Sequence, residues 1–141
     1  DAGGEIRQKI KLPIAIPEDG RFEVFCQDAQ GISPSGMPFR LIDTPNAFEA
    51  EPNDDVSKIP SVGTAPLALH GIIEKEGDID FFKFSAKKGQ VFEVNCYARR
   101  LGSRLDSVMF MGAVGGGAFA SNDDSGGPDS YFRVTIPNDG E

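Results

Sequence analysis

Apolar and polar residues alternate along most of this chain. Near the start, Ile10, Leu12, Ile14 and Ile16 alternate with Lys, Pro or Ala, the period of a strand with one solvated face. The same period predicts further strands at 21–27, 36–42, 67–73, 80–85, 90–98, 107–112 and 131–136. No segment keeps a helical period, although 54–58 could form one turn. Short strands between frequent turn signals predict an all-β fold, an antiparallel β-sandwich or jelly roll.

A short phrase occurs twice, 120 residues apart. Ile16–Gly20 reads Ile-Pro-Glu-Asp-Gly, and Ile136–Gly140 reads Ile-Pro-Asn-Asp-Gly. Asp1–Gly4 similarly matches Asp124–Gly127, 123 residues later. Two ordered matches indicate a repeated β-domain, although Ile-Pro-x-Asp-Gly is also a common strand-to-turn phrase. On the repeat interpretation, the chain opens late in one copy and closes at about the same point in the next.

The segment 43–60 is rich in Pro, Asn, Asp and Glu and is the natural seam between units. It predicts a division into residues 1–46 and 47–141. Residues 1–46 would be either the C-terminal strands of a preceding repeat or strands that close the second part.

Composition limits the partners. The 141 residues are 39% hydrophobic and carry 22 acidic against 14 basic side chains, a net charge of −8. Such a surface disfavours a nucleic-acid backbone and suits solubility or Ca²⁺. The longest apolar run, Val108–Ala120, is too short to span a bilayer and is broken by glycines. We therefore expect no membrane insertion.

Cys26 and Cys96 sit in similar strand phrases, Phe-Glu-Val-Phe-Cys and Phe-Glu-Val-Asn-Cys. Two buried thiols and an inter-strand disulfide of a secreted protein both fit. We favour thiols, since sequence does not supply the geometry that a disulfide needs.

Several phrases of residues 47–141 follow one another in a familiar order. They are Glu49–Asp54 (Glu-Ala-Glu-Pro-Asn-Asp), Gly77–Phe84, Gly89–Val94, Ala98–Asp106, Asn122–Asp124 and Ile136–Gly140. Together they resemble the bacterial pre-peptidase C-terminal domain family, a collagen-binding-domain-like β-sandwich appended to secreted peptidases and other exported proteins. The Ala-Arg-Arg-Leu-Gly-Ser phrase is similar to versions found in tandem in planctomycete secreted or surface proteins.

The resemblance implies a calcium site. In collagen-binding members, acidic residues of the first phrase and of the loop before the Asp-aromatic strand hold Ca²⁺. Carried over to this sequence, the implied metal ligands are Glu49, Glu51, Asn53, Asp54, Asp78 and Asp80. The loop 74–77 departs from the family because it has no obvious counterpart to its further oxygen ligands. The competing interpretation is a turn and helix cap, in which Asn or Asp accepts backbone N–H groups.

The resemblance also bears on the N-terminal strands. A closing strand follows Pro-x-Asp-Gly in the family, and Gly20–Phe25 with Met37–Leu41 looks like that ending. These strands would close the sandwich as in a circular permutant, within one chain or by exchange between two, or belong to a preceding module. Bare strand edges are avoided in proteins, which favours closure.

We expect no catalysis. His70 is the single histidine and is expected to face solvent, and no Gly-x-Ser-x-Gly phrase marks a nucleophile. Tyr97, Arg99 and Arg100 are candidate binding residues, since Tyr and Arg are favoured at interfaces. Pairing of these arginines with nearby acids is the competing interpretation.

The preferred function is a non-catalytic accessory module of an exported bacterial protein, secreted, periplasmic or at the cell surface. It would be calcium-stabilised, and would bind protein or polysaccharide or space neighbouring domains of a larger chain. The alternatives are a metal-free structural repeat of a tandem surface protein and a hydrolase fragment with a cryptic site. Fold resemblance supports a fold more firmly than a function.

Overall fold

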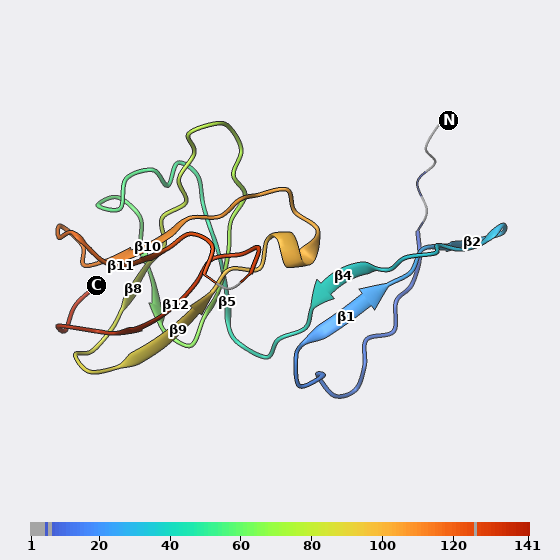
Figure 1. The fold of residues 1–141 in the computed structure, drawn as a ribbon, viewed down its shortest axis with the longest axis horizontal. Coiled ribbons are helices and arrows are strands. Elements are labelled where there is room, and N and C mark those ends of the chain that lie inside the picture. The colour runs from blue at the N-terminus through green and yellow to red at the C-terminus, as the bar shows by residue number, and fades with distance from the viewer. Residues whose placement is uncertain (1–4, 6, 126) are drawn as a thin grey trace. The chain divides into compact units, whose positions relative to one another are not determined.

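The computed structural model describes residue 5 and residues 7–125 and 127–141. The chain forms two units (Figure 1). Unit 1 contains the residues up to Asp43 together with Tyr97–Asp106, and unit 2 contains Thr44–Cys96 and Ser107–Glu141. No pattern in the sequence indicates that 97–106 groups with the N-terminal residues. The division into 1–46 and 47–141 stays a prediction, and part of the repeated phrase at 1–4 and 124–127 lies outside the described residues.

Unit 1 is built from two antiparallel strand pairs. Strand β1 (Arg21–Val24) pairs with β4 (Met37–Arg40), and β2 (Gln27–Asp28) pairs with β3 (Gly31–Ile32). The 3₁₀ helix η1 (Arg99–Leu101) contacts β4. A tight turn precedes β1, because the N–H of Gly20 donates to the carbonyl of Pro17 at 2.8 Å and Gly20 has a φ of 68°, a conformation that favours glycine.

The predicted strand at 10–16 is wrong. Residues 7–20 form no strand, and the side chain of Ile14 is completely exposed. Pro13 lies within this segment and Pro17 follows it, and neither has the N–H that a strand ladder needs. The contact with the rest of unit 1 comes instead from Gln8, whose side-chain amide donates to Phe25 O at 3.1 Å and accepts from Gln27 N at 3.0 Å.

The described residues of unit 2 form eight strands in four pairs. The strands are β5 (Asn46–Phe48), β6 (Ser61–Thr64), β7 (Ala68–His70), β8 (Lys83–Ser85), β9 (Val91–Asn95), β10 (Met109–Gly112), β11 (Ala118–Asn122) and β12 (Tyr131–Thr135). The pairs β9–β12 and β10–β11 are antiparallel. The pairs β5–β7 and β6–β8 are parallel. The all-β prediction is therefore confirmed, but the expectation of purely antiparallel pairing is not.

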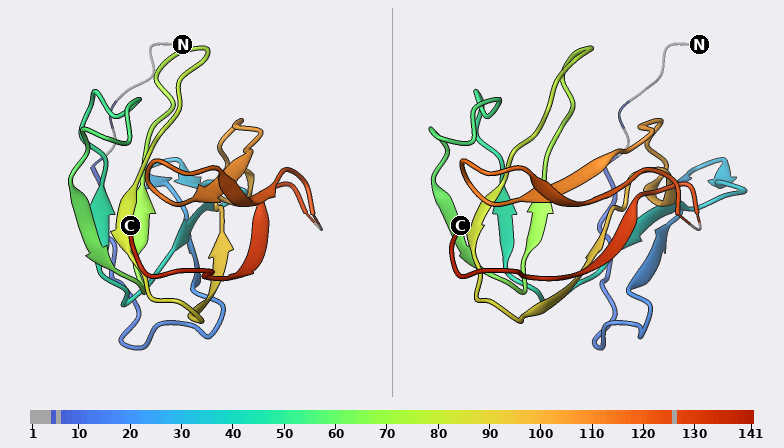
Figure 2. Two further views of the ribbon diagram at one scale, coloured as in Figure 1. Left: turned by 90° about the vertical axis from the view of Figure 1, so that its left-hand side faces the viewer. Right: turned by 60° about the vertical axis from the view of Figure 1, so that its left-hand side comes forward.

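The two kinds of pair occupy different sides of unit 2. Figure 2 shows strands β5, β6, β7 and β8 together on one side and strands β9, β10, β11 and β12 on the other. Alternation along β9 turns Phe92 and Val94 inward and exposes Val91, Glu93 and Asn95. The ring of Phe92 meets that of Phe84 edge-on, with centroids 5.7 Å apart, a favoured aromatic geometry.

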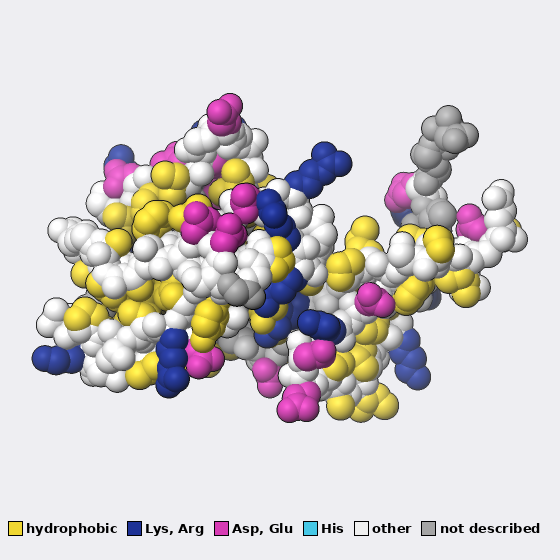
Figure 3. Space-filling view, viewed as in Figure 1, with side chains coloured by type: hydrophobic (Ala, Val, Ile, Leu, Met, Phe, Trp, Pro, Cys, Tyr) yellow, Lys and Arg dark blue, Asp and Glu magenta, His cyan; other side chains and the backbone are white. Residues whose placement is uncertain are grey.

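The buried core is small. Ile59, Phe132 and Ile136 are the described apolar residues of unit 2 with less than about a tenth of their surface exposed. Many large apolar side chains reach the surface instead, as the yellow areas of Figure 3 show. In the described part of the chain, no helix has the length and apolar character needed to cross a membrane. There is also no disulfide among these residues, with Cys26 exposed and Cys96 half-buried.

Candidate metal centre

The parallel pair β5–β7 brings two chain segments to the same sheet edge. Parallel strands end on the same side, and Phe48 and His70 form the last pair in the register. The N–H of Glu49 then donates to the carbonyl of His70 at 3.0 Å. Glu49 and Gly71 therefore follow their strands side by side, at the point where the candidate site begins.

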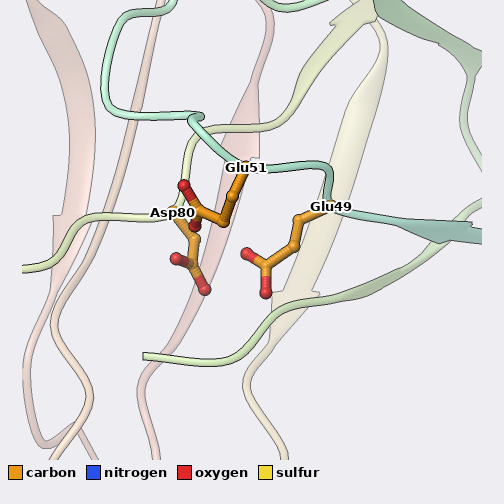
Figure 4. A group of neighbouring side chains, drawn as sticks. All are labelled: Glu49, Glu51 and Asp80. Carbon is orange, nitrogen blue, oxygen red and sulfur yellow. The ribbon is translucent and has the colours of Figure 1, made fainter. Parts of the chain in front are cut away.

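Three carboxylates meet at this edge. Glu49 and Glu51 come from the segment after β5, and Asp80 comes from the segment before β8 (Figure 4). One oxygen of each lies within 4.8 Å of the others. Alternate residues of an extended segment point to one side, which explains why Glu49 and Glu51 converge while the residue between them does not.

Gly71 is needed for this approach. A Cβ atom on Gly71 would lie 2.2 Å from Asp80 Oδ2 and 2.9 Å from Glu49 Oε2. Any other residue at this position would push the two carboxylates away. The backbone next to it also contributes, because the N–H of Ile72 donates to Glu49 Oε1.

A buried amide completes the cluster. Asn53 is 1% exposed; its Nδ2 donates to Glu49 Oε2 at 2.9 Å, and its backbone N–H donates to Glu51 Oε2 at 3.0 Å. Its Oδ1, like Oδ1 of Asp80, is buried and accepts no hydrogen bond from the described residues. Buried polar atoms normally have a partner, so these two oxygens are available to a hydrogen-bond donor or a cation.

The electrostatics point the same way. The pKa of Asp80 is raised from 3.8 to about 6, first by desolvation and then by the charge and hydrogen bond of Glu49, with Asp78 and Glu51 adding further repulsion. Carboxylates this close repel one another when all of them are ionised, and a bound cation would offset that repulsion. The cluster is thus destabilised in its fully charged, cation-free form.

The predicted ligands Asp54 and Asp78 are placed differently. Asp54 is exposed, and neither residue belongs to the group of converging carboxylates. Oδ2 of Asp78 accepts the N–H of Glu74 at 2.7 Å, although its charge still acts on Asp80. Their role as ligands stays a prediction.

The turn that follows is capped by Asp55. Its Oδ1 accepts the N–H of Ser57 at 3.0 Å, and its side chain meets Lys58 Nζ at 2.8 Å. These contacts lower the pKa of Asp55 to about 2, with Lys58 as the largest cause. Asp55 therefore makes the capping contact that the competing interpretation assigned to Asn53 or Asp54, and Asn53 turns to Glu49.

The donor set suits a hard cation. Ca²⁺ takes six to eight oxygens from carboxylates, amide oxygens and water. Glu49, Glu51, Asp80 and Asn53 supply only oxygen donors, with no thiol or imidazole among them. The residues present are therefore compatible with a hard divalent cation such as Ca²⁺.

The other singled-out residues are engaged within their own units. His70 is exposed, as predicted; its Nε2 contacts Asn46 Oδ1 at 2.7 Å and its ring stacks on Phe48. Arg40 and Arg100 lie 3.9 and 4.2 Å from the ring centroid of Tyr97, as cation–π pairs do.

Arg99 pairs with an acid of the same unit. Its Nη2 lies 3.1 Å from Asp106 Oδ1. Such pairing was the competing interpretation of the Tyr97, Arg99 and Arg100 group. A binding role for that group stays a prediction.

Comparison with known proteins gives one partial similarity. Over 92 residues, 64% of this chain, the sequence is 34% identical to a "Probable subtilase-type serine protease" of Deinococcus radiodurans. The matched segment spans 13% of that protein. No model of a known protein family matches the chain, and no solved structure matches it. The chain is thus similar to a small part of a subtilase-type protein.

Proposed function

We propose that this chain is a non-catalytic accessory module of an exported protein, stabilised by Ca²⁺ at the candidate metal centre. The observation that carries the proposal is the convergence of Glu49, Glu51 and Asp80 around two buried oxygens without hydrogen-bond donors. A divalent cation would neutralise the carboxylates and supply both oxygens with a partner.

The partial similarity supports the accessory role. A segment that corresponds to 13% of a much longer subtilase-type protein is the size of one appended module. Its task would be to space neighbouring domains of the parent chain or to bind protein or polysaccharide, with no part in catalysis. The resemblance to the pre-peptidase C-terminal domain family agrees with this assignment.

We further propose that the two sides of unit 2 form the layers of a jelly-roll-like sandwich. In that arrangement the metal centre lies at the end of the parallel pair β5–β7, where the chain leaves β5. The ion would tie Glu49 and Glu51 to Asp80, which lies about thirty residues further along the chain. Closing such a loop limits the freedom of the unfolded chain, as a disulfide does.

Calorimetric titration of the EDTA-stripped chain with Ca²⁺ tests the metal. We expect saturable binding in the wild type, its loss in Glu51→Gln, and its retention in Glu76→Gln, an exposed acid of the 74–77 loop. Binding that survives Glu51→Gln would place the ion elsewhere. No binding at all would refute the calcium part.

The second candidate is a metal-free structural repeat. The repeated Ile-Pro-x-Asp-Gly phrase favours it, because repeats gain stability from their neighbours. Under this function EDTA would leave the melting temperature unchanged, and a two-repeat chain would melt higher than a single repeat. The accessory module predicts instead that EDTA lowers the melting temperature of the single chain.

A further inference from the structure

Strands β5 and β7 carry a group of aromatic and polar side chains that the metal centre does not use. Asn46 and Phe48 lie two residues apart in β5, and the parallel register puts Phe48 beside His70 of β7. Alternate residues of a strand share one face, and all three residues are exposed. We call Asn46, Phe48 and His70 the aromatic platform.

The platform is ordered by its own contacts. The rings of Phe48 and His70 stack with centroids 4.8 Å apart and an interplanar angle of 20°. Nε2 of His70 lies 2.7 Å from Oδ1 of Asn46, and it is the donor because an amide oxygen only accepts. Side chains that are already held in place lose less entropy when a ligand binds.

One face of the Phe48 ring is open to solvent. His70 covers the opposite face, and 73% of the surface of Phe48 is nevertheless exposed. The face of an aromatic ring carries partial negative charge, so it attracts C–H groups that lie flat against it. The open face therefore suits a ligand with a flat surface of C–H groups.

Hydrogen-bonding groups lie on the same face of the strand pair. Asn46 is two residues from Phe48, about 7 Å along the strand, and its Nδ2 carries two N–H donors. A neutral imidazole that donates from Nε2 is an acceptor at Nδ1. A polymer that lies on Phe48 and continues along β5 can thus meet both donors and an acceptor.

The charge of unit 2 limits what this polymer can be. Thr44–Cys96 and Ser107–Glu141 together contain fourteen acidic and six basic side chains. Like charges slow the encounter and disfavour the complex. Uronic-acid and sulfated polysaccharides and acidic peptides are therefore poor partners for the aromatic platform, and a neutral polymer is favoured.

We propose that the aromatic platform binds a neutral polysaccharide of β-linked glucose rings. In such a ring every hydroxyl is equatorial, so each flat side presents only C–H groups and can lie on Phe48. The hydroxyls at the rim both donate and accept hydrogen bonds, which matches Asn46 and His70. This inference rests on the accessory function proposed above, whose ligand it names, but it needs no metal ion.

Affinity electrophoresis in native gels tests the ligand class. Hydroxyethylcellulose in the gel should retard the wild-type chain. Carboxymethylcellulose, which has the same glucan backbone but is anionic, should retard it less. No retardation by hydroxyethylcellulose would overturn the proposal. Equal retardation by casein would also overturn it, because it would show that the exposed apolar surface adheres to polymers in general.

Variants in the same gels test the site. Phe48→Ala should lower the affinity for hydroxyethylcellulose by at least about tenfold, whereas Phe48→Tyr should keep it because the flat ring remains. Phe110→Ala is the matched control, since Phe110 in β10 is 70% exposed and lies outside the aromatic platform. Retardation that Phe48→Ala leaves unchanged, or that Phe110→Ala weakens equally, would overturn the proposal.

The single histidine of the chain gives a readout that needs no variant. On titration with cellohexaose, the ring-proton NMR signals of His70 should shift, with the same dissociation constant that calorimetry gives for this sugar. Binding that leaves these signals unchanged would place the sugar elsewhere and overturn the proposal.

Ca²⁺ titration of the same chains separates this inference from the proposed function. A chain that binds Ca²⁺ but no polysaccharide refutes the aromatic platform alone and leaves the calcium-stabilised module standing. Polysaccharide binding through Phe48 in a chain that binds no Ca²⁺ supports the aromatic platform and refutes the calcium part alone.

Discussion

Asp80→Asn is expected to stabilise the metal-free chain at neutral pH while it removes a metal ligand. Burial and the neighbouring acids raise the pKa of Asp80 from 3.8 to about 6 in the folded state. Between these two values the folded state holds the proton more tightly than the unfolded state. The contribution of this group to stability is therefore present below about pH 4 and is lost as the pH rises through 6. Asparagine does not ionise, so the variant avoids this loss.

The size of the effect follows from the same two pKa values. The gap from 3.8 to about 6 corresponds to about 3 kcal/mol at 1.36 kcal/mol per pKa unit. Asp80 is only half-buried, and solvent screening reduces such values. We therefore expect a gain of about 1–2 kcal/mol above pH 6, or about 3–8 °C in melting temperature for a chain of this size.

Scanning calorimetry in EDTA between pH 4 and 8 measures this effect. The wild type should lose stability from pH 4 to 6 relative to Asp80→Asn, and the two curves should converge at low pH. Glu76→Gln serves as a surface control with no expected effect. If Asp80→Asn melts below the wild type at pH 7.5 in EDTA, or keeps the wild-type slope, the electrostatic reasoning fails.

Three further substitutions test separate contacts. Gly71→Ala should weaken Ca²⁺ binding in calorimetric titration, because its methyl group meets the two carboxylates. The melting temperature of the metal-free chain should change much less. Ser130→Ala should cost about 1–3 kcal/mol in denaturant unfolding, since it removes a fully buried hydroxyl that contacts Ser107 Oγ at 3.0 Å and donates to the carbonyl of Asp123 at 2.8 Å. Asp139→Asn should remove stability that the wild type has above pH 4 and loses in acid, because the N–H of Lys88 lowers the pKa of Asp139; melts at pH 3 and 7 compare the two.

Local alternation predicted where several of the strands lie, but not how they pair. The segments at 21–27, 36–42, 90–98 and 131–136 contain β1, β4, β9 and β12. The segment 10–16 shows the same alternation without a strand, because alternation reports only how a strand would present its faces. Whether a ladder forms also depends on free N–H groups, which Pro13 lacks, and on a neighbouring strand, which a local window does not show. The parallel pairs were missed for the same reason.

The candidate site was predictable in part. The acids after β5 stand out because they alternate, and the resemblance pointed to them and to Asp80. Gly71 was not predictable, since a glycine after an apolar run also fits an ordinary turn. Its importance comes from Asp80 Oδ2, which belongs to another segment and lies where a Cβ on residue 71 would stand. Likewise, only the fold shows that Asn53 is buried and that Asp55 caps the turn.

The interleaved pairing of unit 2 has a consequence for folding kinetics. Strands β5 to β8 pair first with third and second with fourth, so no neighbouring strands in this stretch form a hairpin. The hairpin β10–β11 closes a short loop and can form early, whereas the parallel pairs must wait for distant segments. The acids after β5 and before β8 would then meet only after the rate-limiting barrier. Stopped-flow measurements should show that Ca²⁺ slows unfolding and leaves the refolding rate almost unchanged.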